Sequence, residues 1–261
     1  MTRDFDMLSA LQMVQDITAE AGLIALGMFG QVEGREKDDG TLVTEADRRV
    51  EQYIRKRILD QYPHHMVFGE EDGSGGMEQS PFLWLLDPID GTNNFASGVP
   101  IWGISVGLFY KGKPFLGVLH MPCLDQTFWA SDGEGAYCDG TRVSVRRTDT
   151  LARNDLLLIS SPNIPHWDFS AQVKYRITGS TAYSMALVAA GNAVGTVCNH
   201  WYVWDVGASM VLLKEVGALV TDIHGQSLFD LENRDYRAPG PCMVAASPEC
   251  HALLMQHVKT S

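Results

Sequence analysis

The sequence has no long hydrophobic run and little positive charge, and each absence excludes a class of protein. No stretch of 18 apolar residues occurs, so a transmembrane helix is not expected. The first residues, Met1–Leu8, are too acidic for a signal peptide. The sequence has 20 Lys and Arg but 32 Asp and Glu, which gives a net charge of −12 and argues against a nucleic-acid partner. We therefore expect a cytoplasmic protein without a membrane or nucleic-acid partner.

The five cysteines also lack any pairing pattern. They are odd in number, widely scattered and without a C-x-x-C spacing, at positions Cys123, Cys138, Cys198, Cys242 and Cys250. A disulfide framework or a zinc site is therefore not expected, and reduced thiols are the simplest account. An acidic protein that handles an anionic substrate needs local help from metal ions or backbone N–H groups.

The first half of the chain predicts two helices followed by a sheet. Apolar spacing favours a helix over 5–29. Thr44–Asp47 resembles a capping box and opens a second helix that ends near residue 60. Strands are then expected at 66–68, 82–86, 101–110, 114–121, 126–131 and 141–146, the last four as an antiparallel meander.

The second half changes to alternating strands and helices. Strands are expected at 155–160, 194–198, 218–222 and 242–246, with helices at 182–191, at 205–216 and towards residue 257. This alternation predicts a smaller α/β half. We expect an N-terminal half, 1–150, and a C-terminal half, 151–261, that share one cleft.

The stretch 82–95 carries the strongest chemical signal. Five apolar residues, Phe82–Leu86, precede Asp87-Pro88 and are typical of a buried strand that stops abruptly. Asp87 and Asp90 then follow the strand's carboxyl end, and Gly91-Thr92 can start a helix whose free N–H groups attract phosphate. Two carboxylates beside an anion site suit a hard cation bridged to phosphate. A strand, a turn and an Asp N-cap with no function would give the same pattern.

Other acidic residues occupy comparable positions. Glu70 follows the strand 66–68, and Asp205 follows Trp204 at the start of a helix. Several carboxylates at strand ends and helix starts would give Mg²⁺ the oxygen ligands it prefers. Asp47 and Thr92 add a carboxylate–hydroxyl pair able to orient and deprotonate water.

These motifs together resemble the inositol monophosphatase family. The resemblance rests on Gly69-Glu-Glu71, on Trp84-Leu-Leu-Asp-Pro-Ile-Asp-Gly-Thr-Asn-Asn-Phe95 and on Trp204-Asp205, supported by Leu42–Asp47, Gly135–Gly140 and Glu215-Val-Gly217. It covers roughly residues 37 to 222 in the family's order and spacing. It implies an α/β (α+β) fold, a layered αβαβα sandwich, and a Li⁺-sensitive phosphatase that forms a homodimer.

The resemblance also implies a metal site with two or three Mg²⁺ ions. In the family, the residues that match Glu70, Asp87 and the carbonyl of Ile89 hold one ion. Those that match Asp87, Asp90 and Asp205 hold a second.

Catalytic and substrate-binding roles are implied in the same way. The catalytic set corresponds to Asp47, Thr92 and Glu70, with the Asp47–Thr92 pair orienting the attacking water. Phosphate oxygens are expected on the metals and on the N–H groups of Gly91 and Thr92.

Gly179, Ser180 and Thr181 are expected to line the alcohol side of the substrate, and Asp90 and Asp205 are also expected to bind substrate. Inositol-specific members carry a glutamate where this chain has Cys198, and a thiol is a poor acceptor for a polyol hydroxyl. His200 lies in the same region.

Several substrates therefore stay open. Inositol 1-phosphate or a related polyol or sugar phosphate is the first choice, histidinol phosphate the second and 3′-phosphoadenosine 5′-phosphate the third. Lys37 lies where the family often has a basic residue near the site, although a turn lysine is the commoner explanation. A non-catalytic binding or regulatory member is the alternative of another class.

Overall fold

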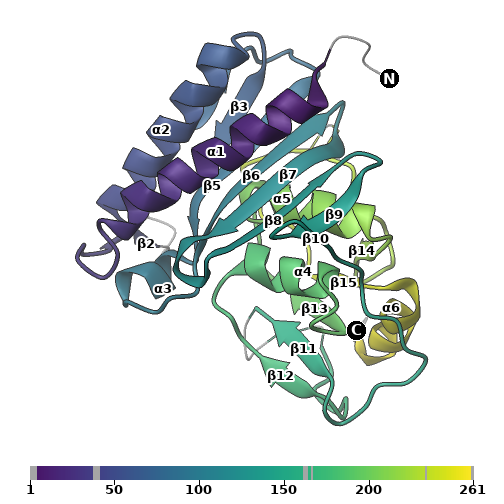
Figure 1. The fold of residues 1–261 in the computed structure, drawn as a ribbon. Helices are drawn as coiled ribbons and strands as arrows, with labels where there is room; N and C mark the ends of the chain where they lie inside the picture. Colours follow the sequence, from purple (N-terminus) through teal and green to yellow (C-terminus); the bar gives the residue numbers. More distant parts are fainter. Residues whose placement is uncertain (1–4, 38–41, 161–163, 166, 233, 260–261) are drawn as a thin grey trace.

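The protein stacks helices and sheets in five layers, as the computed structural model of residues 5–37, 42–160, 164–165, 167–232 and 234–259 shows (Figure 1). Two long helices cover one face of a large sheet, two further helices lie behind it, and a second sheet with a last helix follows. This order confirms the predicted αβαβα sandwich. No helix in the described ranges has the length and apolarity needed to cross a bilayer.

The described helices are α1 (Met7–Leu26), α2 (Glu45–Gln61), α3 (Thr92–Ala96), α4 (Thr181–Ala189), α5 (Val203–Glu215) and α6 (Pro248–Leu254), with 3₁₀ turns at Pro122–Leu124 and Met255–His257. The strands of the first half are β1 (Arg35–Glu36), β2 (Leu42–Val43), β3 (Met66–Gly69), β4 (Gly73–Gly76), β5 (Phe82–Asp90), β6 (Gly103–Tyr110), β7 (Lys113–Met121), β8 (Gln126–Ser131), β9 (Gly135–Cys138) and β10 (Thr141–Arg142). Those of the second half are β11 (Leu156–Ile159), β12 (Lys174–Arg176), β13 (Gly195–Cys198), β14 (Leu219–Asp222) and β15 (Met243–Ala246).

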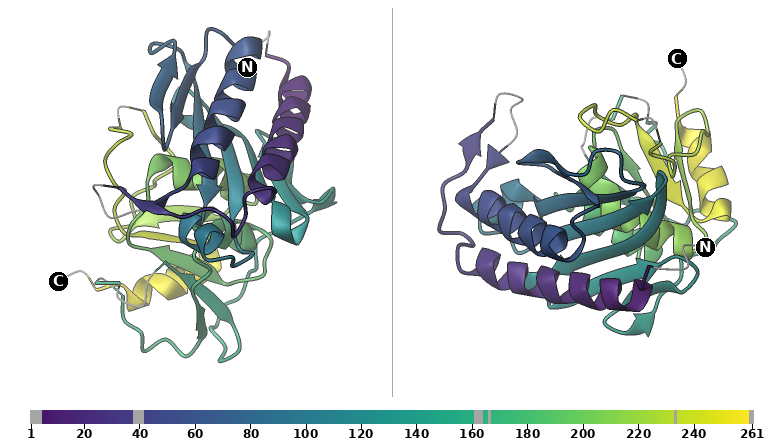
Figure 2. Two further views of the ribbon diagram at one scale, coloured as in Figure 1. Left: turned by 90° about the vertical axis from the view of Figure 1, so that its left-hand side faces the viewer. Right: turned by 90° about the horizontal axis from the view of Figure 1, so that it is seen from above.

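The outer helices α1 and α2 lie side by side on the large sheet (Figure 2). Their buried faces, which include Val14, Ile17 and Ile54, pack on Trp84 and other apolar residues of the sheet. The capping box predicted at the start of α2 is present, with Thr44 as the N-cap. Burial of these faces removes apolar surface from water and fixes α2 against the sheet.

The large sheet has eight strands in the order β10-β9-β8-β7-β6-β5-β3-β4. The strands from β5 to β10 form an antiparallel meander that contains the predicted strands β6, β7 and β8, whereas β3 runs parallel to β5. Because β3 and β5 are parallel neighbours, the residues that follow Gly69 and Leu86 emerge at the same edge.

Helix α5 lies close against the other face of this sheet. Gly107 of β6 and Gly117 of β7 face Gly207 and Ala208 of α5, with no side chain on either strand residue. The close approach places the start of α5 beside the end of β5.

The second sheet has five strands in the order β12-β11-β13-β15-β14. Helix α4 packs between the two sheets, and α6 covers the outer face of the smaller one. A core that includes Met185, Val206 and Met210 fills the space between the sheets.

Three expectations about strands were wrong or incomplete. The strand predicted at 141–146 pairs only over Thr141–Arg142, because the chain then leaves the sheet edge and buries Val145 in the core. The predicted strands also omit β9, which pairs with β8 on one side and with β10 on the other. The short strands β4 and β12 carry little apolar signal and were not predicted.

Candidate active site

Four carboxylates from three parts of the fold face one small cleft. Glu70 follows β3, Asp87 and Asp90 belong to the end of β5, and Asp205 lies in the first turn of α5. All four line a cavity of about 170 Å³, together with the predicted residues Ile89, Gly91, Thr92, Gly179 and Thr181. The structure therefore brings the predicted metal-ligand set together.

The strand that carries two of these carboxylates does not stop where it was predicted to stop. β5 continues to Asp90, with an irregularity in its pairing to β6 between Asp87 and Asp90. Pro88, which has no N–H to donate, falls within this irregularity. Within it, Asp87 Oδ1 accepts a hydrogen bond from the Ile89 N–H at 3.1 Å.

Asp90 caps the start of α4 from a distant part of the chain. Its Oδ1 accepts from the Thr181 N–H at 3.1 Å, and its Oδ2 accepts from the Ala182 N–H at 3.0 Å and from the Ser180 hydroxyl. Burial raises the pKa of Asp90 to about 6, against the lowering effect of these hydrogen bonds. The contacts tie the end of β5 to the second half of the chain.

Asp47 and Thr92 form the predicted carboxylate–hydroxyl pair. Asp47 Oδ2 accepts from the Thr44 N–H at 2.8 Å and from the Thr44 hydroxyl at 2.6 Å, which fixes the carboxylate. The Thr92 hydroxyl lies 3.2 Å from Asp47 Oδ1 and 3.1 Å from the Ile89 carbonyl oxygen. Burial raises the pKa of Asp47, which is fully buried behind Thr92.

Glu70 has a cationic neighbour. Lys37 Nζ donates to Glu70 Oε1 at 2.8 Å and to Glu71 Oε1 at 2.6 Å. Burial raises the pKa of Glu70 to about 8, although the nearby ammonium of Lys37 opposes this rise. Lys37 is thus part of the charge balance of the cleft, beyond the turn role that its sequence context favoured.

Asp87 and Asp205 have raised pKa values for the same cause. Burial raises the pKa of Asp205 to about 7, and the charge of Asp90 adds to the rise. Burial raises the pKa of Asp87 well above its ordinary value, with further contributions from Glu70 and Asp90. Asp205 Oδ2 accepts from the Tyr202 N–H at 2.8 Å, which orients it. These carboxylates need a cation to be ionised together.

The predicted helix start after Asp90 is a short turn of helix, α3, preceded by Gly91. Gly91 has φ +97°, and a Cβ there would lie 3.1 Å from both the Gly179 and Ile101 carbonyl oxygens. Only glycine fits this left-handed backbone without strain. The backbone beside the carboxylates is therefore tightly constrained.

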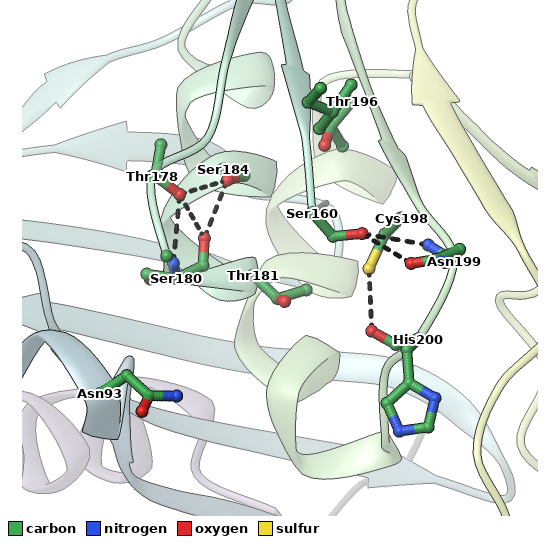
Figure 3. Close-up of a pocket in the computed structure, with 12 residues that line it drawn as sticks. Asn93, Ser160, Thr178, Ser180, Thr181, Ser184, Thr196, Cys198, Asn199 and His200 are labelled. Carbon is green, nitrogen blue, oxygen red and sulfur yellow. Dashed lines mark hydrogen bonds between the residues drawn. The ribbon is translucent and has the colours of Figure 1, made fainter. Parts of the chain in front are cut away.

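A larger pocket opens beside the cleft and shares Asn93, Gly179 and Thr181 with it. It holds about 440 Å³, and Figure 3 shows hydroxyls of Thr178, Ser180 and Ser184 on one side. Ser160, Cys198, Asn199 and His200 lie on the opposite side, and Thr196 is drawn above and between the two groups. The lining residues in the described ranges include no Lys, Arg, Asp or Glu.

Cys198 lies in this wall with its thiol already engaged. The Sγ donates to the His200 carbonyl oxygen at 3.1 Å, and burial raises the pKa of Cys198 to about 11. Beside it, Ser160 Oγ donates to Asn199 Oδ1 at 3.1 Å and accepts from the Asn199 N–H at 3.2 Å. The wall therefore offers uncharged hydrogen-bonding groups.

Asn94 supports the site without lining either cavity, and the sequence interpretation gave it no role. Its Nδ2 donates to the Ile101 carbonyl at 2.6 Å and to the Thr178 carbonyl at 2.9 Å. It joins the turn after Asp90 to the segment that includes Gly179. The partners lie far apart in sequence, so only the Asn-Asn repeat after Thr92 could have drawn attention to it.

The donor set of the cleft suits Mg²⁺. Carboxylate oxygens and the Ile89 carbonyl are hard ligands, and buried carboxylates in such number require compensating positive charge. Within the described part of the chain, no three His, Cys, Asp or Glu side chains already form a closed coordination group. Asp90 and Glu70 instead use their oxygens on Ser180, the start of α4 and Lys37. The residues fit a hard divalent ion by chemistry and position.

A cleft of four carboxylates that fits divalent cations is the kind of site at which metal-dependent enzymes hydrolyse phosphate esters. Comparisons with known proteins show the family to which the chain belongs. The sequence profile of the inositol monophosphatase family matches residues 6–261. The chain belongs to this family and is a phosphatase, that is, a phosphoric monoester hydrolase. Members of the family are generally metal-dependent.

Curated relatives and a solved structure cover most of the chain. A fructose-1,6-bisphosphatase/inositol-1-monophosphatase from Thermotoga maritima is 33% identical, over 79% of this chain and 82% of its own length. A histidinol-phosphatase from Chlorobaculum parvum is 32% identical, over 85% of this chain and 89% of its own. A Thermotoga maritima IMPase structure superposes with a TM-score of 0.82 at 28% identity, over 95% of this chain and 96% of that one.

Proposed function

We propose that the protein is a Mg²⁺-dependent phosphomonoesterase that hydrolyses a small phosphorylated alcohol, with inositol 1-phosphate or a related polyol or sugar phosphate first. One observation carries this proposal: Glu70, Asp87, Asp90 and Asp205 face a single cleft that shares its wall with an uncharged, hydroxyl-lined pocket. A cleft of carboxylates alone repels phosphate, so divalent cations must intervene.

Two ions would use overlapping ligands. Glu70, Asp87 and the Ile89 carbonyl would hold one, and Asp87, Asp90 and Asp205 would hold the other. When bound, the ions supply charge neutralisation for the phosphoryl group and lower the pKa of water. The shared Asp87, buried and without a cationic partner among the described residues, is the ligand that most needs this compensation.

The attacking water would be oriented by Thr92 and Asp47. The Thr92 hydroxyl can accept from the water while it donates to Asp47 Oδ1, 3.2 Å away. Thr44 holds the other carboxylate oxygen, so Asp47 keeps its orientation during the reaction. Burial raises the pKa of Asp47 and makes the carboxylate a better proton acceptor.

The phosphate would rest on the N–H groups of Gly91 and Thr92. In phosphoryl transfer, positioning and charge neutralisation supply most of the catalysis. The water oxygen bonds to phosphorus while one of its protons passes by way of the Thr92 hydroxyl to Asp47. The bond from phosphorus to the alcohol oxygen breaks, and the departing alkoxide takes a proton from a second water and leaves into the larger pocket as the alcohol.

The lining of the larger pocket supports a neutral alcohol. Hydroxyls of Ser160, Thr178 and Ser184 and the amide of Asn199 can exchange hydrogen bonds with polyol hydroxyls. Histidinol phosphate stays the second candidate, since a relative carries the name histidinol-phosphatase. Its ammonium group would meet no carboxylate among the described residues that line this pocket.

A phosphate-release screen tests the proposal. The purified protein is assayed with Mg²⁺, or with a chelator, on inositol 1-phosphate, histidinol phosphate, fructose 1,6-bisphosphate and 3′-phosphoadenosine 5′-phosphate. We expect Mg²⁺-dependent release that is greatest for the neutral polyol ester and is lost in Asp90→Asn. Absence of turnover on every ester with Mg²⁺ bound would favour a non-catalytic binding or regulatory member.

Three further expectations remain predictions, the first implied by the family resemblance and the other two drawn from the sequence pattern. They are a homodimer, a cytoplasmic location, and a division into halves 1–150 and 151–261. Light scattering of the purified protein at several concentrations tests the first of these.

A further inference from the structure

One further buried carboxylate, Glu51, lies outside the cleft and has no part in the chemistry proposed above. Glu51 is on α2, is fully buried, and does not line the carboxylate cleft. Burial of a carboxylate is costly unless hydrogen bonds or a cation compensate it. The groups that offset the cost of burying the Glu51 carboxylate therefore indicate its structural role.

The groups that bond to Glu51 are backbone N–H groups of the turn after Glu70 and the side chain of Arg55, which also bonds to that turn. Glu51 Oε2 accepts from the Glu71 N–H at 2.8 Å, and Oε1 accepts from the Asp72 N–H at 3.0 Å. Arg55 Nη2 donates to Glu51 Oε1 at 2.8 Å and to the Gly73 carbonyl at 2.7 Å. One carboxylate and its arginine thus hold the three residues that follow Glu70.

The residue before Glu70 touches the same carboxylate. A Cβ on Gly69 would lie 2.1 Å from Glu51 Oε1, so the carboxylate occupies the space that any other side chain would need. On the opposite side, the Glu70 N–H donates to the Leu86 carbonyl at 3.2 Å, one residue before Asp87. The backbone of Glu70 is fixed between Glu51 and β5.

We propose that Glu51 is a positioning residue for Glu70, acting through the N–H groups of Glu71 and Asp72 to hold that side chain towards Asp87 and the metal cleft. The inference rests on the proposed function, because it assigns Glu70 to metal binding. It also explains why glycine precedes the Glu70-Glu71 pair. Charge-assisted hydrogen bonds to backbone N–H groups are strong enough to set the orientation of a short turn.

Glu51→Gln tests the proposal, because the side chain keeps its shape and loses its charge. One oxygen can still accept, but the amide NH₂ would face N–H donors. We expect the Mg²⁺ concentration at half-saturation to rise about tenfold or more, with a smaller change in the maximal rate. Magnesium affinity measured by calorimetry without substrate should weaken by the same factor.

Two variants make the test specific. Glu51→Asp keeps the charge but is too short to reach both N–H groups, so it should fold and show an intermediate loss of affinity. Asp60→Asn removes the acid of the exposed Lys56–Asp60 pair, an i,i+4 pair on the same helix, and should bind Mg²⁺ as the unaltered protein does.

The outcomes separate this inference from the proposed function. A lower melting temperature with unchanged Mg²⁺ affinity in both Glu51 variants would make Glu51 merely structural and overturn the inference. Weakened Mg²⁺ binding in both variants would uphold it, even if the unaltered protein released no phosphate from any ester. An unaltered protein that binds no Mg²⁺ would overturn both proposals.

Discussion

The contact between helix α5 and the large sheet makes a sharp prediction about Gly107. A Cβ at this position would lie 2.4 Å from the Gly207 carbonyl carbon, whereas ordinary contacts begin at 3.4 Å. Both partners are backbone, so no rotation of a side chain can relieve the clash. Gly107→Ala should therefore push α5 outwards by about 1 Å, and Asp205 with it.

Gly107→Ala should lower both the stability and the activity of the protein. Overpacking of a filled core typically costs about 1–3 kcal/mol of the free energy of unfolding. A misplacement of about 1 Å can cost about a hundredfold in rate. We expect a lower urea midpoint for Gly107→Ala, and Mg²⁺-dependent phosphate release reduced by one to two orders of magnitude.

Gly27→Ala is the matched control. Gly27 has φ −63°, and its Cβ would lie 3.5 Å from the nearest atom, which is an ordinary contact. This variant should keep full activity and lose no stability, because alanine restricts the unfolded chain more than glycine does. Unchanged stability and activity in Gly107→Ala would refute the packing argument.

Three further predictions use the site and its surroundings. Thr92→Val and Asp47→Asn should each reduce the maximal rate of phosphate release by about a hundredfold or more. The Mg²⁺ affinity measured by calorimetry should stay near that of the unaltered protein. A large loss of Mg²⁺ affinity would contradict the proposal that these residues orient the attacking water. Li⁺ and Ca²⁺ should inhibit by competing for the carboxylate oxygens, and a kinetic titration insensitive to both would count against the mechanism. Burial lowers the pKa of His65 to about 4, and its Nδ1 accepts from Trp84 Nε1 at 3.1 Å, so the fold favours neutral His65. As the pH falls from 6.5 to 4, His65 is protonated in the unfolded chain before it is protonated in the folded protein, so the free energy of unfolding falls. The urea midpoint of His65→Phe should therefore fall less over this pH range than that of the unaltered protein. An equal fall in both proteins would exclude His65 as the cause.

Local patterns were sufficient to predict much of the fold. Helix α2 has both its capping box at Thr44 and an apolar stripe that includes Val50, Ile54 and Ile58, and the structure has it over Glu45–Gln61. The meander from β5 to β8 follows from apolar strands separated by turns. The resemblance to the family, confirmed by the sequence profile, supplied the order of the layers.

Other features depend on contacts that no local pattern encodes. The continuation of β5 through Pro88 requires the irregular pairing with β6. The contact of Asp90 with the start of α4 joins residues about 90 positions apart. Asn94 and Glu51 act on backbone groups of other segments, so their partners become visible only in three dimensions.

The most direct test of the account measures Mg²⁺ binding and phosphate release on one preparation. Calorimetric titration of the metal-free protein is compared with release from inositol 1-phosphate at the same Mg²⁺ concentrations, for the unaltered protein and Asp87→Asn. We predict that the two curves rise together in the unaltered protein and that both are lost in the variant, because Asp87 is shared by both ions. Phosphate release that persists in Asp87→Asn, or in the unaltered protein after a chelator has removed the metal, would contradict the account.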